Sequence, residues 1–339
     1  MKFALFSLLP LLPVVYATVP FLEKFENWVQ QFRIRFADEH HFYDVLQKWI
    51  TNNRYIDFVN SENREYKLGL NQFAGMDESD FIKYVMTNNY LFNRREDAVD
   101  TSIRRPFTNS SENSLPSYVN WVTSGAVTPV KDQGQCGSCW SFSSTGALEG
   151  IYQIMTGKLV EFSEQQLVDC DNLKNGGKDH GCNGGIMDNS FTWISKNGGL
   201  CTEDEYPYIS GDGTTEACKK SCPLVPKSKI ASYVDVDTSD DALMQAISQQ
   251  PVAIAIEADQ RDFQLYKSGV FTGNCGTNLD HGVLVVGYGT ESGSDYYLVK
   301  NSWGTTWGEG GYIKLGRGPQ YNSGKGQCGI LLEASYPTL

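Results

Sequence analysis

Residues 132–142 read DQGQCGSCWSF and place two cysteines three positions apart, between a loop and a helix pattern. Cys139 is the first residue of this helix pattern, which ends at Gly157. A thiol at a helix N-terminus feels the positive end of the helix dipole, which lowers its pKa, and the unpaired backbone N–H groups there can bind an oxyanion. Such a stretch suits a nucleophile beside a disulfide, a redox dithiol, half of a metal site or an ordinary crowded turn.

The partners of a nucleophilic thiol can be sought among few residues, because only two of the four histidines lie beyond residue 115. His180 lies in the polar, glycine-rich KDHGCNGG, where a solvated side chain is expected, whereas His281 opens the strand pattern HGVLVVGYG. Asn301 ends the strand pattern DYYLVKN; if the two strands are neighbours, it can accept a hydrogen bond from the imidazole and fix its tautomer. Trp303 would shield that bond from water, and Gln133 offers an amide to the oxyanion.

The redox and metal alternatives are weaker. A C-x-x-C dithiol usually follows a parallel strand, and none is expected before Cys136. A metal site needs two more ligands at close spacing, and His180 with Cys182 is the nearest candidate. The chain has nine cysteines, an odd number, so pairing leaves one thiol free.

The first seventeen residues have the pattern of a secretory signal peptide, with Lys2 before an apolar run and Ala17 at the cleavage position. A membrane anchor is the alternative, but Pro10 and Pro13 interrupt a run that is already short. Entry into the secretory pathway favours disulfides. It also makes Asn109 a glycosylation candidate, in the sequon Asn109–Ser111.

Charge limits the classes of partner. The chain carries a formal net charge of −12, and the acidic excess lies mainly beyond residue 115. An acidic chain argues against nucleic acid and against an anionic membrane surface as partners.

Periodicity divides the chain into three regions. Apolar residues at helical spacing predict helices over 21–36 and 39–60, followed by a short extended piece at YKLGLNQFAGM and a polar linker over 93–114. Residues 139–156 and SEQQLVDC predict two helices, the second with Ser163 as N-cap and Gln166 in a capping box. Beyond residue 229 the period becomes two, which predicts strands. We therefore expect an α+β fold of two lobes with a site in the cleft between them.

The chain resembles the papain-like cysteine proteases of the cathepsin L-like branch. The likeness rests on GAVTPVKDQGQCGSCWSF, SEQQLVDC, GCNGG, YPY, DHGVLVVGYG and KNSWGTTWGEGGYIKL, which occur in this order. The first of these contains the C-G-[SA]-C-[WY] signature that is typical of the family. The resemblance implies that Cys139 is the nucleophile, His281 the general acid and base, Asn301 the residue that orients the imidazole, and Gln133 the oxyanion donor.

The resemblance also implies a substrate site and a disulfide framework. Gly185 would bind the backbone of the substrate residue two before the cut, and Glu333 would form the floor of its pocket, which predicts acceptance of large apolar side chains and of arginine. The other substrate-binding residues would be Ile186, Met187, Ala255, Leu279, Gly282 and Trp303. The implied disulfides are Cys136–Cys182 and Cys275–Cys328, then Cys170 with Cys218 or Cys222, the remaining one pairing with Cys201.

The N-terminal part resembles the inhibitory pro-region of the same family, with departures. Trp49, Asn52, Ile56 and Asn60 fit its helix motif, and Gly69, Asn71 and Phe73 fit a second motif. His41 and Val45 stand where Glu and Arg are expected, and Gly75 replaces an acidic residue.

These observations predict a papain-like fold with a helical left lobe, a β-barrel-like right lobe and an N-terminal helical pro-domain. The expected division is a signal peptide at 1–17, an inhibitory pro-region with its linker at 18–114 and a protease domain at 115–339. No insertion bearing a histidine pair blocks the cleft, so we expect an endopeptidase made as a zymogen, without metal or other cofactor. Its expected partners are peptide substrates, its own pro-region and cystatin-type inhibitors, and we expect a monomer in the lysosome, the vacuole or the extracellular space. A non-catalytic binding protein and a secreted disulfide oxidoreductase are the competing classes.

Overall fold

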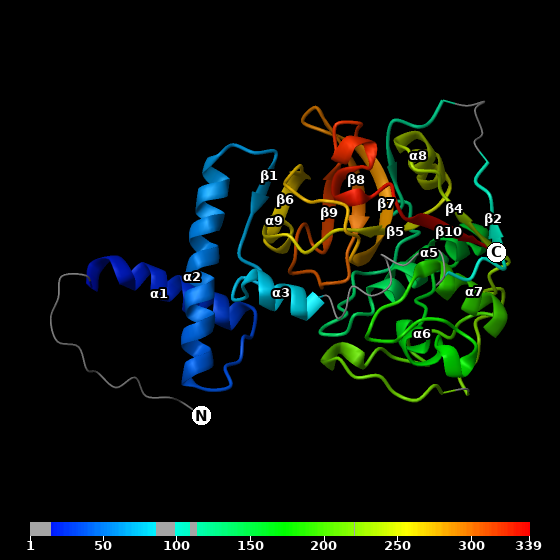
Figure 1. Cartoon of the computed structure of the whole chain (residues 1–339), viewed down its shortest axis with the longest axis horizontal. Coiled ribbons are helices and arrows are strands. Elements are labelled where there is room, and N and C mark those ends of the chain that lie inside the picture. The colour runs from blue at the N-terminus through cyan, green and yellow to red at the C-terminus, as the bar shows by residue number, and fades with distance from the viewer. Residues whose placement is uncertain (1–14, 86–98, 109–113, 220) are drawn as a thin grey trace.

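The computed structural model describes residues 15–85, 99–108, 114–219 and 221–339. A helical N-terminal region stands beside a larger body, in which one part is built on helices and the other on a sheet (Figure 1). The helices are α1 (Val15–Gln31), α2 (Glu39–Ser61), α3 (Glu78–Val85), α5 (Cys139–Thr156), α6 (Glu164–Cys170), α7 (Met187–Asn197), α8 (Asp240–Gln249) and α9 (Arg261–Gln264). Among the described residues, no helix is long and apolar enough to cross a membrane.

Within the described part of the chain, ten strands form one sheet. They are β1 (Tyr66–Leu68), β2 (Arg104–Arg105), β3 (Val119–Asn120), β4 (Ser232–Asp235), β5 (Val252–Ile256), β6 (Tyr266–Phe271), β7 (His281–Glu291), β8 (Ser294–Lys300), β9 (Tyr312–Gly316) and β10 (Ala334–Thr338). The strand order is β1-β6-β9-β8-β7-β5-β10-β4-β2, and β3 pairs with β7 outside this path. The path is open, so the expected barrel-like lobe is not a closed barrel. Its two ends are occupied by β1 and β2, which both precede residue 115.

The helix and strand predictions hold for most elements. α5 begins at Cys139 and ends before Gly157, whose φ of 72° is the left-handed conformation that glycine adopts readily. The helix predicted over 21–36 ends at Gln31, because the chain turns at Arg33 with φ 53°. Ser163 caps α6 as predicted, but the Gln166 side chain accepts a hydrogen bond from the Cys201 backbone instead of completing the capping box.

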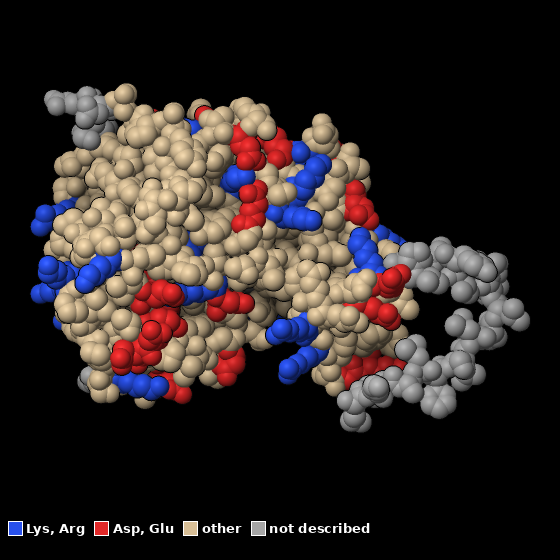
Figure 2. Space-filling view, turned by 180° about the vertical axis from the view of Figure 1, so that it is seen from behind, with Lys and Arg blue, Asp and Glu red and all other residues tan. Residues whose placement is uncertain are grey.

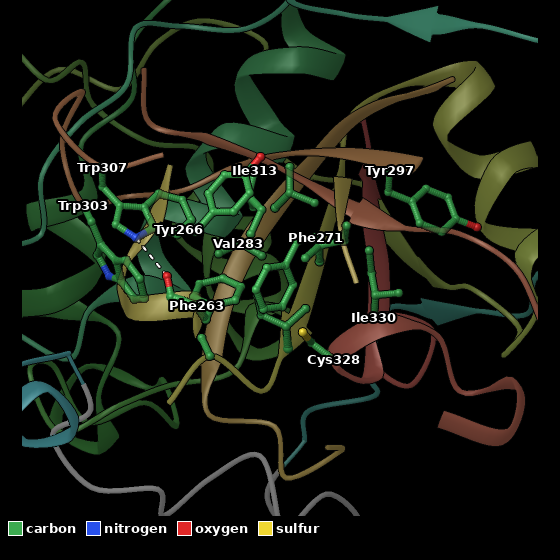
Figure 3. Close-up of a cluster of buried hydrophobic side chains, with 14 of the residues drawn as sticks. Phe263, Tyr266, Phe271, Val283, Tyr297, Trp303, Trp307, Ile313, Cys328 and Ile330 are labelled. Atoms are coloured by element: carbon green, nitrogen blue, oxygen red, sulfur yellow. Dashed lines mark hydrogen bonds between the residues drawn. The ribbon is translucent and has the colours of Figure 1, made fainter. Parts of the chain in front are cut away.

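Two large apolar clusters hold the molecule together. One joins the N-terminal helices to the sheet, so that Trp28 and Trp49 belong to the same cluster as Trp303 and Trp307. Figure 3 shows the sheet side of this cluster, where the Trp307 indole donates to the carbonyl of Phe263 at 3.2 Å. The second cluster lies between α5, α7 and the sheet. Acidic and basic side chains are interspersed on the face shown in Figure 2, where the N-terminal lobe lies to the right of the body.

Candidate active site

Cys139 is the first residue of α5, where sequence analysis placed it. It is 5% exposed and is the one free cysteine among the nine, all of which lie in the described part of the chain. Its sulfur accepts hydrogen bonds from the backbone of Trp140 and of Gly282, the residue after His281. α5 is fixed against β7 by the hydroxyl of Ser143, which donates to the carbonyl of Val283 at 2.7 Å. The thiol therefore lies at the start of β7, beside the histidine.

The neighbouring strands β7 and β8 bring His281 and Asn301 together. The distance from His281 Nε2 to Asn301 Oδ1 is 2.8 Å, and the Ser302 backbone N–H donates to the same oxygen at 2.7 Å. Because the Ser302 donor identifies Oδ1 as an acceptor, Nε2 must carry the imidazole proton. Nδ1 has no hydrogen-bond partner among the described residues. In the neutral ring Nδ1 is thus a free lone pair that can take a proton from a thiol.

Trp303 covers the imidazole. Its ring stacks on His281 with centroids 4.6 Å apart and an interplanar angle of 23°. Both side chains are buried, at 1% and 0% exposure. The His281–Asn301 bond is therefore kept away from water, as the sequence predicted.

Gln133 lies in the loop before α5 and is fully buried. Its Nε2 donates to the carbonyl of Cys136 at 3.0 Å, and its Oε1 accepts from the hydroxyl of Ser302 at 2.7 Å. The Gln133 backbone also donates to the Ser302 carbonyl at 2.9 Å. Ser302, which sequence analysis did not single out, thus links the proposed oxyanion donor to the Asn301 side chain; only its position next to Asn301 could have signalled it.

Burial acts on both reacting groups in the same sense, by disfavouring charge. It raises the pKa of Cys139 to about 11, although backbone donors to the sulfur oppose the rise. It lowers the pKa of His281 to about 4, although the bond to Asn301 opposes the fall. The thiol pKa, which the helix terminus was expected to lower, is instead raised in this buried state, because desolvation is the larger effect. In this form the chain holds a neutral thiol beside a neutral imidazole.

The predicted substrate-binding residues lie around Trp140 and Gly282. A Cβ on Gly185 would approach the Trp140 ring to 2.4 Å, so the backbone of this loop lies directly against the indole. Gly282 is paired with Ala255 across β5 and β7, and the Ala255 N–H donates to the carbonyl of Glu333 at 2.9 Å.

The remaining predicted pocket residues lie close by. A Cβ on Gly282 would lie 3.3 Å from the sulfur of Met187, and both Met187 and Leu279 belong to the buried cluster around Trp140. Ile186 is buried at the N-terminus of α7. Glu333 is half-buried just before β10.

Eight cysteines form four disulfides, Cys136–Cys182, Cys170–Cys218, Cys201–Cys222 and Cys275–Cys328. The open alternative for Cys170 is thus resolved in favour of Cys218. Since Cys136 and Cys182 are bonded to each other, neither the Cys136/Cys139 dithiol nor a metal site through Cys182 is formed. The glycosylation candidate Asn109 lies outside the described residues.

Comparison with known proteins identifies the family to which the chain belongs. Residues 115–338 match the model of the papain family cysteine proteases, and residues 25–81 match the cathepsin propeptide inhibitor domain. The chain belongs to the papain family of cysteine proteases. Cysteine proteinase RD21A of Arabidopsis thaliana is 47% identical over 84% of this chain, which spans 59% of the length of that relative. Senescence-specific cysteine protease SAG39 of Oryza sativa subsp. japonica is 43% identical over 92% of this chain and 89% of its own length.

Solved proforms of the papain family share the whole architecture. The proform of the ragweed pollen allergen Amb a 11 superposes with a TM-score of 0.82 at 38% identity, covering 94% of each chain. The recombinant stem bromelain precursor superposes with a TM-score of 0.83 at 35% identity, covering 94% of this chain and 99% of its own. The papain-like fold with an N-terminal pro-region is therefore confirmed.

The pro-region contacts the active-site wall through Trp303. Phe73 and Phe81 pack edge-on against its ring at 5.6 Å and 5.4 Å, and the Gln72 amide donates to its carbonyl at 2.6 Å. β1 of the pro-region also pairs with β6. The inhibitory region therefore packs against the Trp303 ring that shields the imidazole.

The departures within the pro-region face each other. A Cβ on Gly75 would lie 2.8 Å from Val45 and 2.7 Å from Trp28, so apolar packing joins the two positions where an acidic residue and an arginine were expected. A lysine of α2 forms the charged link instead, since Lys48 bonds Asp80 at 2.5 Å across to α3. His41 accepts only a local hydrogen bond, from the backbone of Ala37.

Proposed function

We propose that this papain-family member is a cysteine-type endopeptidase, made as a secretory zymogen. The single observation that carries the proposal is the hydrogen bond from His281 Nε2 to Asn301, which leaves Nδ1 free in the residue before Gly282, whose backbone reaches the one unpaired thiol. The names of its relatives, cysteine proteinases and endopeptidases, support the same reaction.

The reaction begins with proton transfer from Cys139 to Nδ1 of His281 when the site is opened. The thiolate then attacks the carbonyl carbon of the scissile peptide, and the electron pair moves to the carbonyl oxygen. The Cys139 backbone N–H and the second N–H of the Gln133 amide stabilise this oxyanion. His281 next gives its proton to the leaving amine, and the C–N bond breaks to leave a thioester.

Deacylation reverses these roles. His281 takes a proton from water, the hydroxide attacks the thioester, and the thiolate leaves as the carboxylic acid is released. Asn301 keeps the imidazole in one plane through both half-reactions, and Trp303 excludes water from their bond. Each residue therefore has one chemical task that the geometry supports.

Substrate choice is proposed to depend on the residue two before the cut. Gly185 would pair with its backbone, and the pocket beside Met187, Ala255 and Leu279 would receive its side chain. Glu333 at the pocket floor would add arginine to the large apolar side chains that are accepted. The pro-region would act as the intramolecular inhibitor, and cystatin-type inhibitors would compete for the same surface.

Cellular location and processing are proposed from the sequence. The signal-peptide pattern and four disulfides support the secretory pathway, with the lysosome, the vacuole or the extracellular space as destination. We place the pro-region at 18–114 and a monomeric protease at 115–339.

The test is hydrolysis at acidic pH of two peptides that differ only in phenylalanine or arginine two residues before the cut. Cys139→Ser is the control for catalysis, and Glu333→Gln is the control for the pocket. Wild-type enzyme freed of its pro-region is expected to cleave both, Glu333→Gln only the phenylalanine peptide, and Cys139→Ser neither. No cleavage by the processed wild-type enzyme would refute the function and favour the binding-protein alternative.

A further inference from the structure

Two buried carboxylic acids lie together behind the loop that leads from Cys182 to α7. Asp171 directly follows α6 and is 0% exposed, and Asp179 is 1% exposed. The backbone N–H of Lys178, the residue before Asp179, donates to Asp171 at 3.2 Å, and the two carboxyl groups are close enough for each to shift the pKa of the other. The proposed reaction uses neither of them, yet burying two adjacent acids without a basic partner is costly.

Asp179 binds the loop and the start of α7. Its Oδ1 accepts the backbone N–H of Ile186 at 3.0 Å and the amide of Asn189 at 3.1 Å, and the hydroxyl of Ser190 lies 3.5 Å from its Oδ2. The Ile186 side chain gives α7 no cap. Ile186 follows Gly185, the residue proposed to pair with the substrate backbone. The Asp179 carboxyl is therefore one residue away from the substrate-binding backbone.

A shared proton explains the pair. Two carboxyl groups can hydrogen-bond to each other only if one of them is protonated. Asp171 Oδ1 accepts from the Lys178 backbone at 3.2 Å, whereas its Oδ2 has no donor among the described residues. A proton held between Asp171 and Asp179 supplies that donor. Burial raises the pKa of both groups, so the proton is retained above the pH at which an exposed aspartic acid loses it.

The other charged groups around the pair come from its own loop, from α7 and from the pro-region. Lys196 lowers the pKa of Asp171, but its ammonium bonds Asp100 of the pro-region at 2.6 Å. The Lys178 ammonium donates to the carbonyl of Val99 at 3.1 Å, and His180 is exposed. These facing groups are Lys178, His180, Lys196 and Asp100.

We propose that Asp179 is a positioning residue for substrate binding, which holds the Cys182–Ile186 loop as one half of a carboxyl pair with Asp171 that shares a single proton. This inference rests on the proposed function and deepens it. When the shared proton is lost, two adjacent buried carboxylates repel each other and the loop loosens. A raised pKa in the folded state means that the folded chain keeps a proton that the unfolded chain releases. Stability of the loop is therefore full at acidic pH and falls as the pH rises towards neutral.

The test compares kcat and KM from acidic to neutral pH for the phenylalanine peptide, using variants produced as the full chain and then processed. Asp179→Ala is expected to raise KM about tenfold and to change kcat less than about threefold, because the loop loses an acceptor while the catalytic groups stay in place. Asp179→Asn keeps an acceptor for Ile186 and should restore most of the KM at acidic pH. In Asp171→Asn the amide N–H donates to Asp179 at every pH, so the rise of KM towards neutral pH that is expected of the wild type should disappear.

Asp169→Asn is the matched control. Asp169 is a buried acid two residues before Asp171, but it accepts from the Tyr206 hydroxyl at 2.8 Å and from the Glu216 backbone at 2.9 Å. Alkylation of Cys139 by iodoacetamide counts the accessible thiols in each sample, and far-ultraviolet circular dichroism verifies that each variant is folded. The inference is overturned if Asp171→Asn keeps the wild-type dependence of KM on pH, or if Asp179→Ala behaves as Asp169→Asn does.

Failure of the proposed function can be distinguished from failure of this inference. If the proposed function is wrong, the wild-type enzyme is alkylated at Cys139 but hydrolyses neither peptide. The thermal midpoint of unfolding, measured as a function of pH, would then test whether Asp171 and Asp179 share a proton. A decline of the midpoint towards neutral pH that is smaller in Asp171→Asn than in the wild type would support the shared proton, and an identical decline would overturn it.

Discussion

Tyr66→Phe should open the zymogen without disturbing the protease itself. Tyr66 is 1% exposed, and its hydroxyl donates to Asp262 of the protease domain. The same carboxylate accepts from Tyr55 at 2.5 Å and from Arg64 at 3.0 Å. Three donors of the pro-region thus converge on one buried carboxylate, and the substitution removes one of them while leaving the backbone pairing of β1 intact.

The size of the effect follows from the charge of the acceptor. A hydrogen bond to a charged group contributes about 1.5–3 kcal/mol, so the closed state should be weakened by about 2 kcal/mol, or roughly 30-fold in the opening equilibrium. The ring of Tyr66 keeps its contact with Phe271 in the variant, since centroids 5.0 Å apart do not depend on the hydroxyl. Packing losses should therefore be small.

Alkylation of Cys139 measures this opening. The thiol is buried in the zymogen, so iodoacetamide reacts at a rate proportional to the open fraction when closing is fast. The rate in the full chain, divided by the rate in the processed enzyme, should rise about 30-fold in Tyr66→Phe. Tyr43→Phe is the matched control, because Tyr43 lies on α2 at 54% exposure. A ratio that changes less than about twofold in Tyr66→Phe would refute the role assigned to Asp262.

Three further predictions concern the protease domain. Asn301→Ala should lower kcat by about 10- to 100-fold at nearly constant KM in steady-state kinetics, because the imidazole loses the acceptor that fixes its tautomer; a change in KM alone would contradict this. Glu203→Gln should flatten the pH dependence of stability in urea unfolding, since burial, with Glu164 nearby, raises the pKa of Glu203 from 4.5 to about 8. The folded state keeps the proton, so wild-type stability falls as the pH rises through this range, and an unchanged slope in the variant would count against it. Replacing Cys201 and Cys222 by serine opens a loop of 21 residues and should cost about 3 kcal/mol in the same unfolding assay, whereas a loss below about 1 kcal/mol would disagree.

The elements that carry the proposed catalytic groups could be predicted because their signals are local. The helix pattern begins at Cys139, one strand pattern begins at His281, and the next strand pattern ends just before Asn301. Each of the three residues therefore lies at an end of a predicted helix or strand. The pairing of β7 with β8 then brings the imidazole to the amide. What the spacing could not supply was the protonation of the site, because desolvation depends on everything that covers it.

The contacts that hold the zymogen closed were beyond sequence reasoning for a different reason. Tyr66 and Asp262 are 196 residues apart, and neither residue type is unusual where it stands. Asp171 and Asp179 are close in sequence, but their proximity shows only once the loop between α6 and α7 is folded. The meeting of Val45 with Gly75 explains two departures from the family pattern at once, since each makes sense only in the presence of the other.

Trp303 has a consequence for how this chain can change over evolution. The same indole covers the histidine and receives the two phenylalanines of the inhibitory region. A substitution that freed the enzyme from its inhibitor at this position would also expose the imidazole bond to solvent. Escape from control and loss of catalysis are therefore coupled at one side chain, so a permanently active form cannot arise here by a single step. Trp303 thus protects against premature proteolysis because the residue that receives the inhibitory region also shields the proposed catalytic histidine.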